Sequence, residues 1–396
     1  MTNVVIIGCG VIGAAIAYEL SLVPGLKITV LDKQPPAQGA TGAALGVLMG
    51  VISHKVKGKA WGMRQASIQR YETLIPELEA STGCKIPFNK QGILMLLSSQ
   101  DENTEELAKW ENLVQTRSSQ GWQLEIWDTA QLKSRCPQLN CAATAAIYSP
   151  QDRQVEPAAL TLALVKAAQH NGVTFHFGVI VEGCDLNTRA NQGLRLKTRK
   201  AEQLPLLEAD WLVVAAGLGS SQFLTNIQNC ESHSNNQSLN SLAESNYFNN
   251  ELLPQVDIRP VLGQAIHLKL SGTLGNPDFQ PVITGDDVHI VPIGEGEYWI
   301  GATVEFPTDE GSIVADPAQF AAVMAKAIAF CPALAQATII KTWSGLRPRP
   351  QNRPAPIIER LQSSNILLST GHYRNGVLLA PATAAMIVQM IVPDIV

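Results

Sequence analysis

The sequence predicts an α/β fold combined with an α+β part, in which one domain interrupts another. Three observations support this prediction. A strand–glycine loop–helix–strand pattern opens the chain, alternation typical of antiparallel strands fills residues 264–304, and an α/β pattern returns at residue 366. The first domain is predicted over residues 1–83, 150–225 and 340–396, and the second domain over residues 84–149 and 256–339.

The opening unit predicts a dinucleotide site. Apolar runs over 4–7 and 27–31 indicate buried parallel strands, and GCGVIG with a helix of small residues lies between them. The first glycine permits a tight turn, the second lets the backbone approach a pyrophosphate, and the third lets the helix pack on the strand. Asp32, at the end of the second strand, can bind ribose hydroxyls. The unit does not distinguish NAD from FAD, and a helix with incidental glycines is the alternative.

The remaining elements follow from periodicity and from turn residues. We expect helices over residues 61–83, 101–121, 156–172, 317–330 and 381–391. We expect strands over residues 92–98, 173–181, 211–215, 264–270, 288–293, 298–304 and 366–368. Residues 226–255 are rich in Asn and Ser and poor in aliphatic residues, which predicts a surface or disordered insertion.

Composition excludes several classes of protein. The 396 residues have a net charge of −5, so the chain lacks the basic excess of a general nucleic-acid binder. No run of about eighteen apolar residues predicts a membrane span, and no signal peptide is recognised, so a cytoplasmic location is expected. The seven cysteines are scattered and form no CxxC pair, which suits reduced thiols. Cys136 and Cys141 lack a second ligand pair, so no metal site is expected.

A second glycine-rich stretch favours FAD over NAD. The sequence GATGAALG over residues 39–46 follows soon after Asp32, and its small residues allow the chain to pass closely over a cofactor. NAD enzymes usually have no such element at this position.

The chain resembles the D-amino-acid oxidase superfamily, and within it the glycine oxidase branch linked to thiamine biosynthesis. The matching motifs are GCGVIG with LDK, GATGAALG, VEPAALTLALVKAA, LVVAAG, GQ at 263–264, HIVPIGEGEYWIGATVE, GLRP and GHYRNGVLLAPAT, so they span nearly the whole chain. The resemblance implies a GR2-type FAD-binding Rossmann-like domain, a substrate domain with a mostly antiparallel sheet, and a homo-oligomer.

The resemblance also implies the cofactor contacts. The residues that match the FAD-binding positions are Gly8, Gly10, Val11, Ile12, Gly13, Asp32, Lys33, Ala40, Thr41, Leu45, Gly46, Val47, Val181, Gly217, His372, Tyr373, Arg374, Asn375, Gly376, Val377 and Leu378. Backbone N–H groups of the loop that starts at His372 would stabilise negative charge on the reduced flavin. The segment around His54 does not match relatives with a covalent histidyl link, and no cysteine lies by GLRP, so non-covalent FAD is expected.

The expected substrate site consists of Arg347, Arg374 and His289. Arg347 matches the position that pairs with a substrate carboxylate, which a guanidinium can bind with two parallel hydrogen bonds. Arg374 matches a second substrate-side arginine next to the flavin. His289 stands where the branch often has a tyrosine, and Val304 is apolar, so glycine itself is in doubt as the preferred substrate.

These residues predict FAD-dependent oxidation of the C–N bond of a small amine or amino acid. A hydride would pass from the substrate Cα to flavin N5, the imine would hydrolyse to an oxo acid, and O₂ or another acceptor would take the electrons, with O₂ giving H₂O₂. The alternatives are a D-amino-acid dehydrogenase that reduces a quinone and a flavin-binding protein without turnover. An NAD dehydrogenase would leave GATGAALG and HYRNG without a purpose.

Overall fold

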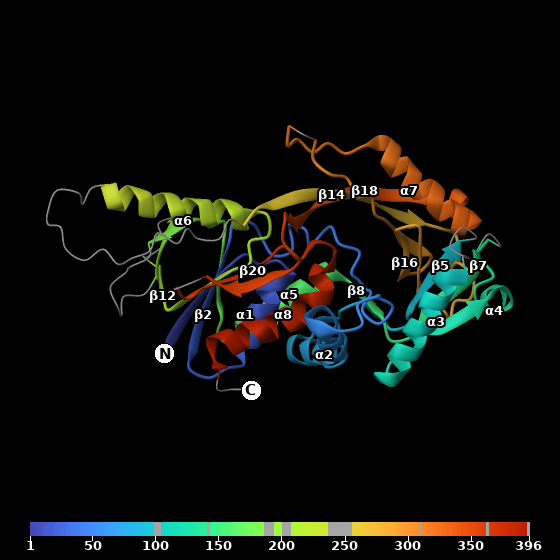
Figure 1. The fold of residues 1–396 in the computed structure, drawn as a ribbon, viewed down its shortest axis with the longest axis horizontal. Coiled ribbons are helices and arrows are strands. Elements are labelled where there is room, and N and C mark those ends of the chain that lie inside the picture. The colour runs from blue at the N-terminus through green and yellow to red at the C-terminus, as the bar shows by residue number, and fades with distance from the viewer. Residues whose placement is uncertain are drawn as a thin grey trace.

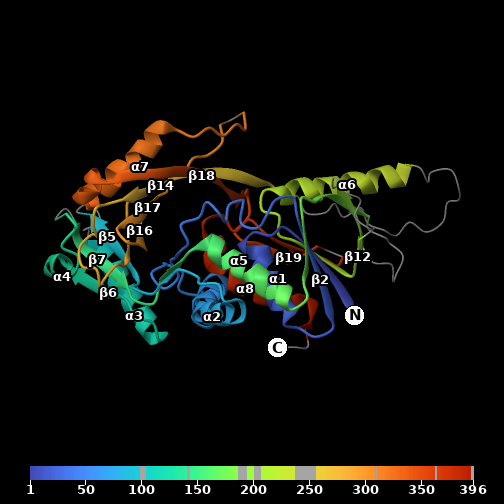
Figure 2. The ribbon, with the colours of Figure 1, turned by 180° about the vertical axis from the view of Figure 1, so that it is seen from behind.

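The computed structural model describes residues 1–98, 104–140, 143–185, 194–199, 207–236, 256–308, 310–361 and 364–393. The chain forms two lobes, and the long strands β14 and β18 lie along one side of both (Figure 1). The reverse view shows helices α1, α2, α5 and α8 together in one lobe and α3 and α4 in the other (Figure 2). The N- and C-terminal ends lie near each other on the first lobe (Figures 1 and 2).

The helices of the described residues are α1 Val11–Ser21, α2 Gly58–Thr82, α3 Thr104–Ser119, α4 Thr129–Arg135, α5 Pro157–His170, α6 Gly219–Asn236, α7 Pro317–Phe330 and α8 Gly376–Ile391, with short 3-10 helices η1 Pro332–Gln336 and η2 Tyr373–Asn375. The strands are β1 Thr2–Ile7, β2 Leu26–Asp32, β3 Val47–Leu48, β4 Phe88–Asn89, β5 Ile93–Ser98, β6 Glu125–Asp128, β7 Ala143–Ser149, β8 Arg153–Val155, β9 Thr174–Phe177, β10 Ile180–Asp185, β11 Leu194–Arg199, β12 Leu207–Ala209, β13 Trp211–Val214, β14 Ile258–Lys269, β15 Val282–Gly285, β16 Val288–Gly294, β17 Glu297–Gly301, β18 Thr338–Pro350, β19 Ile357–Arg360 and β20 Ile366–Thr370.

The first lobe contains a six-stranded sheet in the order β19-β20-β13-β1-β2-β9. All neighbouring strands are parallel except β19, which pairs antiparallel with β20. Helices α1, α5 and α8 pack together with α2, and the smaller sheet β10-β11-β12 lies beside α6. Because β1, β13 and β20 are buried on both faces, they read as continuous apolar runs in the sequence.

The second lobe contains an eight-stranded sheet in the order β18-β14-β17-β16-β15-β5-β7-β6. Its pairs are antiparallel except β5 with β15. Helix α7 packs on one face through Val323 and Ala327, beside Ile290 and Ile300 of the sheet. The opposite face carries Trp299, Val291 and other side chains that pack against the segment Leu45–Met49 of the first lobe. The mixed α/β architecture agrees with the predicted fold class.

One domain boundary differs from the sequence analysis. The sequence predicts that residues 340–396 belong to the first domain. Strand β18, however, pairs with β14 along its whole length, from Thr338 opposite Lys269 to Pro350 opposite Ile258. The chain therefore belongs to the eight-stranded sheet as far as Pro350. No alternation marks β18, because Ile339 and Ile340 are both exposed and the strand lies at the sheet edge. The predicted insertion over 226–255 begins within α6, and residues 237–255 lie outside the described residues.

The start of α8 also differs from the prediction. The helix begins at Gly376, five residues before the predicted start at 381, and Pro381 lies inside it. Proline removes the N–H that would bond the carbonyl four residues earlier, at Val377. The buried Tyr71 hydroxyl donates to that carbonyl at 2.5 Å, so a residue of α2 replaces the missing donor. By length and composition alone, Tyr373–Ile391 is apolar enough to cross a membrane, but 56% of its most apolar window is buried, against α1 and α2.

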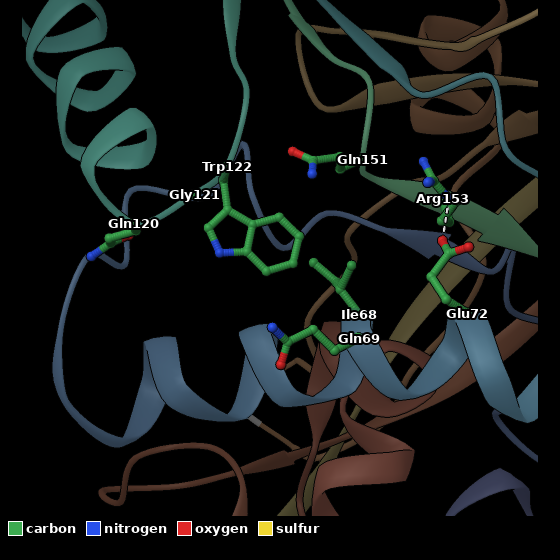
Figure 3. Close-up of a pocket in the computed structure, with 8 residues that line it drawn as sticks. All are labelled: Ile68, Gln69, Glu72, Gln120, Gly121, Trp122, Gln151 and Arg153. Atoms are coloured by element: carbon green, nitrogen blue, oxygen red, sulfur yellow. Dashed lines mark hydrogen bonds and ion pairs between the residues drawn. The ribbon is translucent and has the colours of Figure 1, made fainter.

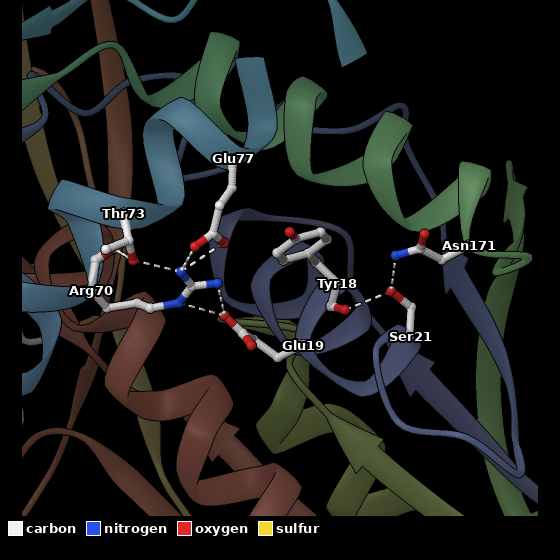
Figure 4. Close-up of polar contacts among 7 residues, drawn as sticks. All are labelled: Tyr18, Glu19, Ser21, Arg70, Thr73, Glu77 and Asn171. Carbon is white, nitrogen blue, oxygen red and sulfur yellow. Dashed lines mark hydrogen bonds and ion pairs between the residues drawn. The ribbon is translucent and has the colours of Figure 1, made fainter. Parts of the chain in front are cut away.

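An ion-pair cluster joins the helices below the sheet (Figure 4). Arg70 of α2 contacts Glu19 of α1 at 3.0 Å and Glu77 of its own helix at 2.7 Å. The Asn171 side chain, which follows α5, donates to Ser21 at the end of α1. These half-exposed contacts fix how α1, α2 and α5 meet, while the free energy comes mainly from the apolar core between them.

The His372 side chain anchors the loop between β20 and α8. It is 3% exposed and its Nε2 lies 3.0 Å from Thr383 Oγ1 on α8. Burial lowers the pKa of His372 to about 3. The side chain therefore stays neutral in the folded protein at pH values where it is protonated in the unfolded chain.

We predict that His372 makes the protein lose stability in mild acid. Its folded pKa lies below the unfolded value, so unfolding takes up a proton and stability falls as pH drops below about 6.5, by about 1.4 kcal/mol per pH unit. His372→Gln keeps a donor for Thr383 but cannot titrate. The decrease in Tm from pH 7 to pH 5 should be smaller in this variant by roughly 2 °C. Equal decreases in both proteins would contradict this assignment.

Candidate active site

A glycine cradle lies at the carboxyl ends of β1 and β13. Gly8 has φ +103°, and a Cβ there would come within 2.5 Å of the Ala215 carbonyl oxygen. A Cβ on Gly13 would overlap the Gly8 carbonyl, so α1 can approach β1 only with glycine at this position. Helix α1 begins after Gly10, and this N-cap residue has no side chain to cap the helix. The N–H groups of the first turn that follow Val11 and the positive end of the helix dipole therefore offer a site for an anion.

Two polar side chains complete this edge. Asp32, at the end of β2, accepts the N–H of Cys9 at 2.6 Å and the N–H of Gln34 at 2.9 Å. Thr41 Oγ1 accepts the N–H of Val11 at 3.0 Å, so the 39–46 stretch reaches over the start of α1. The cradle, the N-terminus of α1 and the carboxylate fit the FAD that the resemblance implies, with its pyrophosphate held at α1 and its adenosine ribose near Asp32.

The segment 45–47 lies between the two lobes and packs closely against strand β8. Gly46 has φ +73°, and a Cβ there would overlap the Val155 carbonyl of β8. The N–H of Val155 donates to Gly46 O at 3.1 Å, and the Gln154 side chain donates to Leu45 O at 3.0 Å. This contact explains why the second glycine-rich stretch needs small residues.

A buried carboxylate, absent from the sequence analysis, holds the next residues. Asp152 is fully buried and accepts the N–H groups of Gly50, Val51 and Ile52 at 2.7, 2.8 and 2.9 Å. Burial raises the pKa of Asp152, and these hydrogen bonds oppose the rise. No local pattern marks this residue, because its partners lie about 100 positions earlier in the chain.

Arg117 of α3 binds the same segment from the other side. It is fully buried, and its guanidinium donates to the carbonyls of Val51, Ser53 and Lys55 at 2.7 to 2.9 Å. The guanidinium also lies 3.6 Å from the ring centre of Trp61. The path of the chain after β3 is therefore set by two charged side chains whose partners are backbone groups.

A cavity of about 530 Å³ lies between the β3 region, helix α3 and the eight-stranded sheet. Its lining contains both apolar and charged or polar side chains. The lining residues are Val47, Met49, Met95, Leu96, Leu97, Glu106, Trp110, Thr284, Gly285, Asp286, Asp287, His289, Arg374 and Asn375. An apolar cavity with a few convergent polar groups is the usual form of a small-molecule site.

The three predicted substrate residues lie around this cavity. His289 and Arg374 line it. Arg347 lies near both residues: its charge lowers the pKa of His289, and the charge of Arg374 lowers the pKa of Arg347. Burial first, and then the charge of Arg374, lowers the pKa of Arg347. Arg374 pairs with Asp287 at 3.2 Å, on the turn between β15 and β16. Two guanidinium groups thus make this end of the cavity suited to a carboxylate.

His289 is neutral at physiological pH. Burial lowers its pKa to about 4, and the positive charge of Arg374 contributes in the same direction. Its Nδ1 is buried and has no hydrogen-bond partner in the described part of the chain. The imidazole therefore presents a neutral polar group beside two cations.

The other predicted cofactor residues differ in what surrounds their side chains. Val47, Arg374 and Asn375 line the cavity, whereas the side chains of His372, Val377 and Leu378 point into the core, so these three residues can meet a cofactor only through their backbone. Val181 packs in the cluster that contains Leu31, next to Asp32, and Gly217 follows β13 with φ +57°. Lys33 and Ala40 are exposed, while Thr41 is buried.

A second cavity, of about 320 Å³, lies beside α2 and around Trp122 (Figure 3). Its charged residues, Arg153 and Glu72, already pair at 2.7 Å. Gln151 accepts the N–H of Gln123. The cavity touches none of the predicted site residues, and no group of ligands able to hold a metal ion occurs among the described residues.

Comparisons with known proteins agree with this geometry. The family DAO, described as FAD dependent oxidoreductase, matches residues 3–390. The bifunctional protein ThiO/ThiG of Trichormus variabilis is 30% identical over 98% of this chain and 52% of its own length. Glycine oxidase of Bacillus subtilis is 28% identical over 98% of this chain and 92% of its own length. The chain thus spans about half the length of the first relatives that it matches.

The fold has close counterparts among solved structures. The crystal structure of glycine oxidase from Geobacillus kaustophilus superposes with a TM-score of 0.80 at 22% identity, and the match covers 99% of this chain and 95% of the other. At this identity the likeness concerns the fold alone. The family match extends from β1 to α8 and includes both the glycine cradle and the cavity. The chain therefore belongs to the DAO family of FAD-dependent oxidoreductases.

Proposed function

We propose that this protein oxidises the C–N bond of a small amino acid, with O₂ as electron acceptor and H₂O₂ as product. The observation that carries the proposal is a cavity lined by Arg374 and a neutral His289, with the guanidinium of Arg347 near both of them. FAD, when bound, would accept a hydride from the substrate. The relatives named glycine oxidase support an amino acid as the substrate.

The arginines bind and orient the substrate. Arg347 and Arg374 offer planar donors to a carboxylate, and such charge-assisted pairs fix direction as well as affinity. A carboxylate held at this end places the adjacent Cα at a defined position in the cavity. The contribution of this step is orientation, which is a major part of catalysis when two reactants must meet.

The same charges favour the reactive form of the amine. A substrate amine must lose its proton before its Cα can give up a hydride. Two nearby guanidinium groups disfavour a third positive charge and so lower the pKa of the bound amine. His289 is neutral and adds no charge of its own, so the site needs no dedicated carboxylate base.

Apolar side chains would keep water away from the reacting atoms. Met49, Met95, Leu97 and Trp110 are among the residues that line the cavity. A dry site strengthens the attraction between the arginines and a carboxylate, because the local dielectric is low.

Three further features belong to the same proposal. FAD binds without a covalent bond, since neither His54 nor any of the cysteines that the structure describes lines the cavity. The protein acts in the cytoplasm, and α8 is a core helix and not a membrane span. It forms a homo-oligomer, as the resemblance implies.

Anaerobic mixing tests the proposed activity directly. The absorbance of the flavin near 450 nm would be followed after addition of glycine, sarcosine or either enantiomer of common amino acids. We expect at least one of them to bleach the flavin and to give H₂O₂ when air is admitted. Bleaching followed by reduction of a quinone but not of O₂ would indicate a dehydrogenase. A yellow protein that no amino acid bleaches would overturn the proposal.

We predict that Arg347→Ala lowers kcat/KM for the best amino acid by at least about a hundredfold, because a charge-assisted pair contributes about 1.5–3 kcal/mol and orientation is lost with it. Arg347→Lys should recover only part of this loss, since one ammonium cannot form the parallel pair. Arg259→Ala on β14 is the control, as this residue is exposed and pairs only with Asp257. Unchanged kinetics in Arg347→Ala would remove the carboxylate assignment.

We also predict that acid precipitation releases all of the flavin. The pelleted protein should be colourless and the supernatant should contain intact FAD in a one-to-one ratio to the chain. Absorbance that stays with the polypeptide after washing in denaturant would demonstrate a covalent link.

A further inference from the structure

The Arg347 guanidinium is held by the backbone of neighbouring strands. Its Nη1 donates to Leu262 O at 3.1 Å and to Thr303 O at 3.0 Å. Nε and Nη2 donate to no group in the described residues. One nitrogen therefore fixes the side chain, and the other N–H groups are available to a ligand.

Gly263 provides the surface on which this guanidinium rests. It lies on β14 and pairs with Gly345 of β18. Gly345 precedes Arg347 by two residues in β18. A Cβ on Gly263 would come within 2.2 Å of Arg347 Nη2, 2.5 Å of Cζ and 2.6 Å of Nη1. Any larger residue at this position would push the guanidinium off the strand.

The two carbonyls that hold Arg347 are both tied to Glu305. Leu262 O also accepts the Glu305 N–H at 3.0 Å, and Leu262 N–H donates to Glu305 O at 2.9 Å. The Thr303 hydroxyl donates to the Glu305 carboxylate, and the N–H of Gln264 donates to Thr303 Oγ1 at 2.8 Å. The Glu305 backbone thus fixes Leu262, and the Glu305 carboxylate fixes the side chain of Thr303, the residue that carries the second acceptor.

The Glu305 carboxylate is itself fully engaged. It is 4% exposed, and it accepts Gln264 Nε2 at 2.9 Å and the N–H of Asp316 at 2.7 Å. Its negative charge also favours the charged form of Arg347, against the effect of Arg374. A buried carboxylate is costly unless it is paired and hydrogen-bonded, so this network has a defined geometry.

We propose that Glu305 and Gly263 are positioning residues that hold Arg347 with its free N–H groups directed to a substrate carboxylate. The inference rests on the proposed function, because it assumes that Arg347 binds this carboxylate. Glu305 contributes through hydrogen bonds and charge, and Gly263 contributes through the space it leaves. Neither side chain touches the substrate.

The test uses the FAD-loaded protein and two probes. Acetate is a carboxylate that cannot be oxidised, and its binding is followed by the change in flavin absorbance. Propylamine is an amine without a carboxylate, and its anaerobic reduction of the flavin measures the rest of the site. The variants are Glu305→Gln and Gly263→Ala. Their matched controls are Glu310→Gln on the exposed loop and Gly272→Ala, whose added Cβ would meet nothing within 4 Å.

We expect Glu305→Gln and Gly263→Ala to weaken acetate binding by about tenfold or more, since a charge-assisted pair is misaligned. The KM of the best amino acid should rise similarly. The two variants should keep their rate with propylamine and their FAD content within about twofold of wild type. Both controls should keep their acetate affinity within the same range.

The outcomes separate this inference from the proposed function. If wild type binds acetate and oxidises an amino acid but both variants bind acetate equally well, the inference is wrong and the proposed function stands. If wild type does neither, the proposed function fails and the inference fails with it. If Glu305→Gln does not fold, Gly263→Ala decides alone. The Cβ that this substitution adds would meet the flexible end of the Arg347 side chain, so the fold should tolerate it.

Discussion

The path of the chain between the two lobes depends on Asp152. This buried carboxylate accepts three consecutive N–H groups, from Gly50 to Ile52, and so turns the chain directly after Met49, which lines the cavity. Burial of an ion costs several kcal/mol unless hydrogen bonds replace its water, and here three backbone donors do so. Arg117 binds the carbonyls of the same segment. The segment next to the cavity lining is therefore held by two charged side chains that do not themselves line the cavity.

The sheet of the second lobe supplies the opposite wall and depends on the same close fit. Gly46 lies against the Val155 carbonyl, and a Cβ at Gly345 of β18 would overlap the Ala43 side chain. Trp343 donates to Ala43 O at 3.1 Å, which joins the sheet to the glycine-rich stretch. Glycines at these contacts let neighbouring segments approach closely, and shared apolar clusters join the two lobes.

The two arginines of the site have different partners and lie at different depths. Arg374 meets Asp287 at the exposed rim, whereas Arg347 lies deeper and is held by carbonyls and by the charge of Glu305. His289 remains neutral between them because burial disfavours its protonated form. A carboxylate ligand would therefore complete the charge pairing of Arg347, and a second cation would be disfavoured next to it.

The sequence by itself determined the opening β1–α1–β2 unit, because its signals are local: an apolar run, three glycines whose spacing suits a tight turn, and an acid at the next strand end. It also marked His289, Arg347 and Arg374 through the family motifs, and the structure brings them near one another, with His289 and Arg374 lining one cavity. Only the tertiary structure decided the rest. Pro381 lies inside a helix because Tyr71, more than 300 residues earlier, supplies the lost hydrogen bond. The roles of Asp152, Glu305 and Gly263 depend on partners from other strands and segments, which no local pattern of residues can reveal.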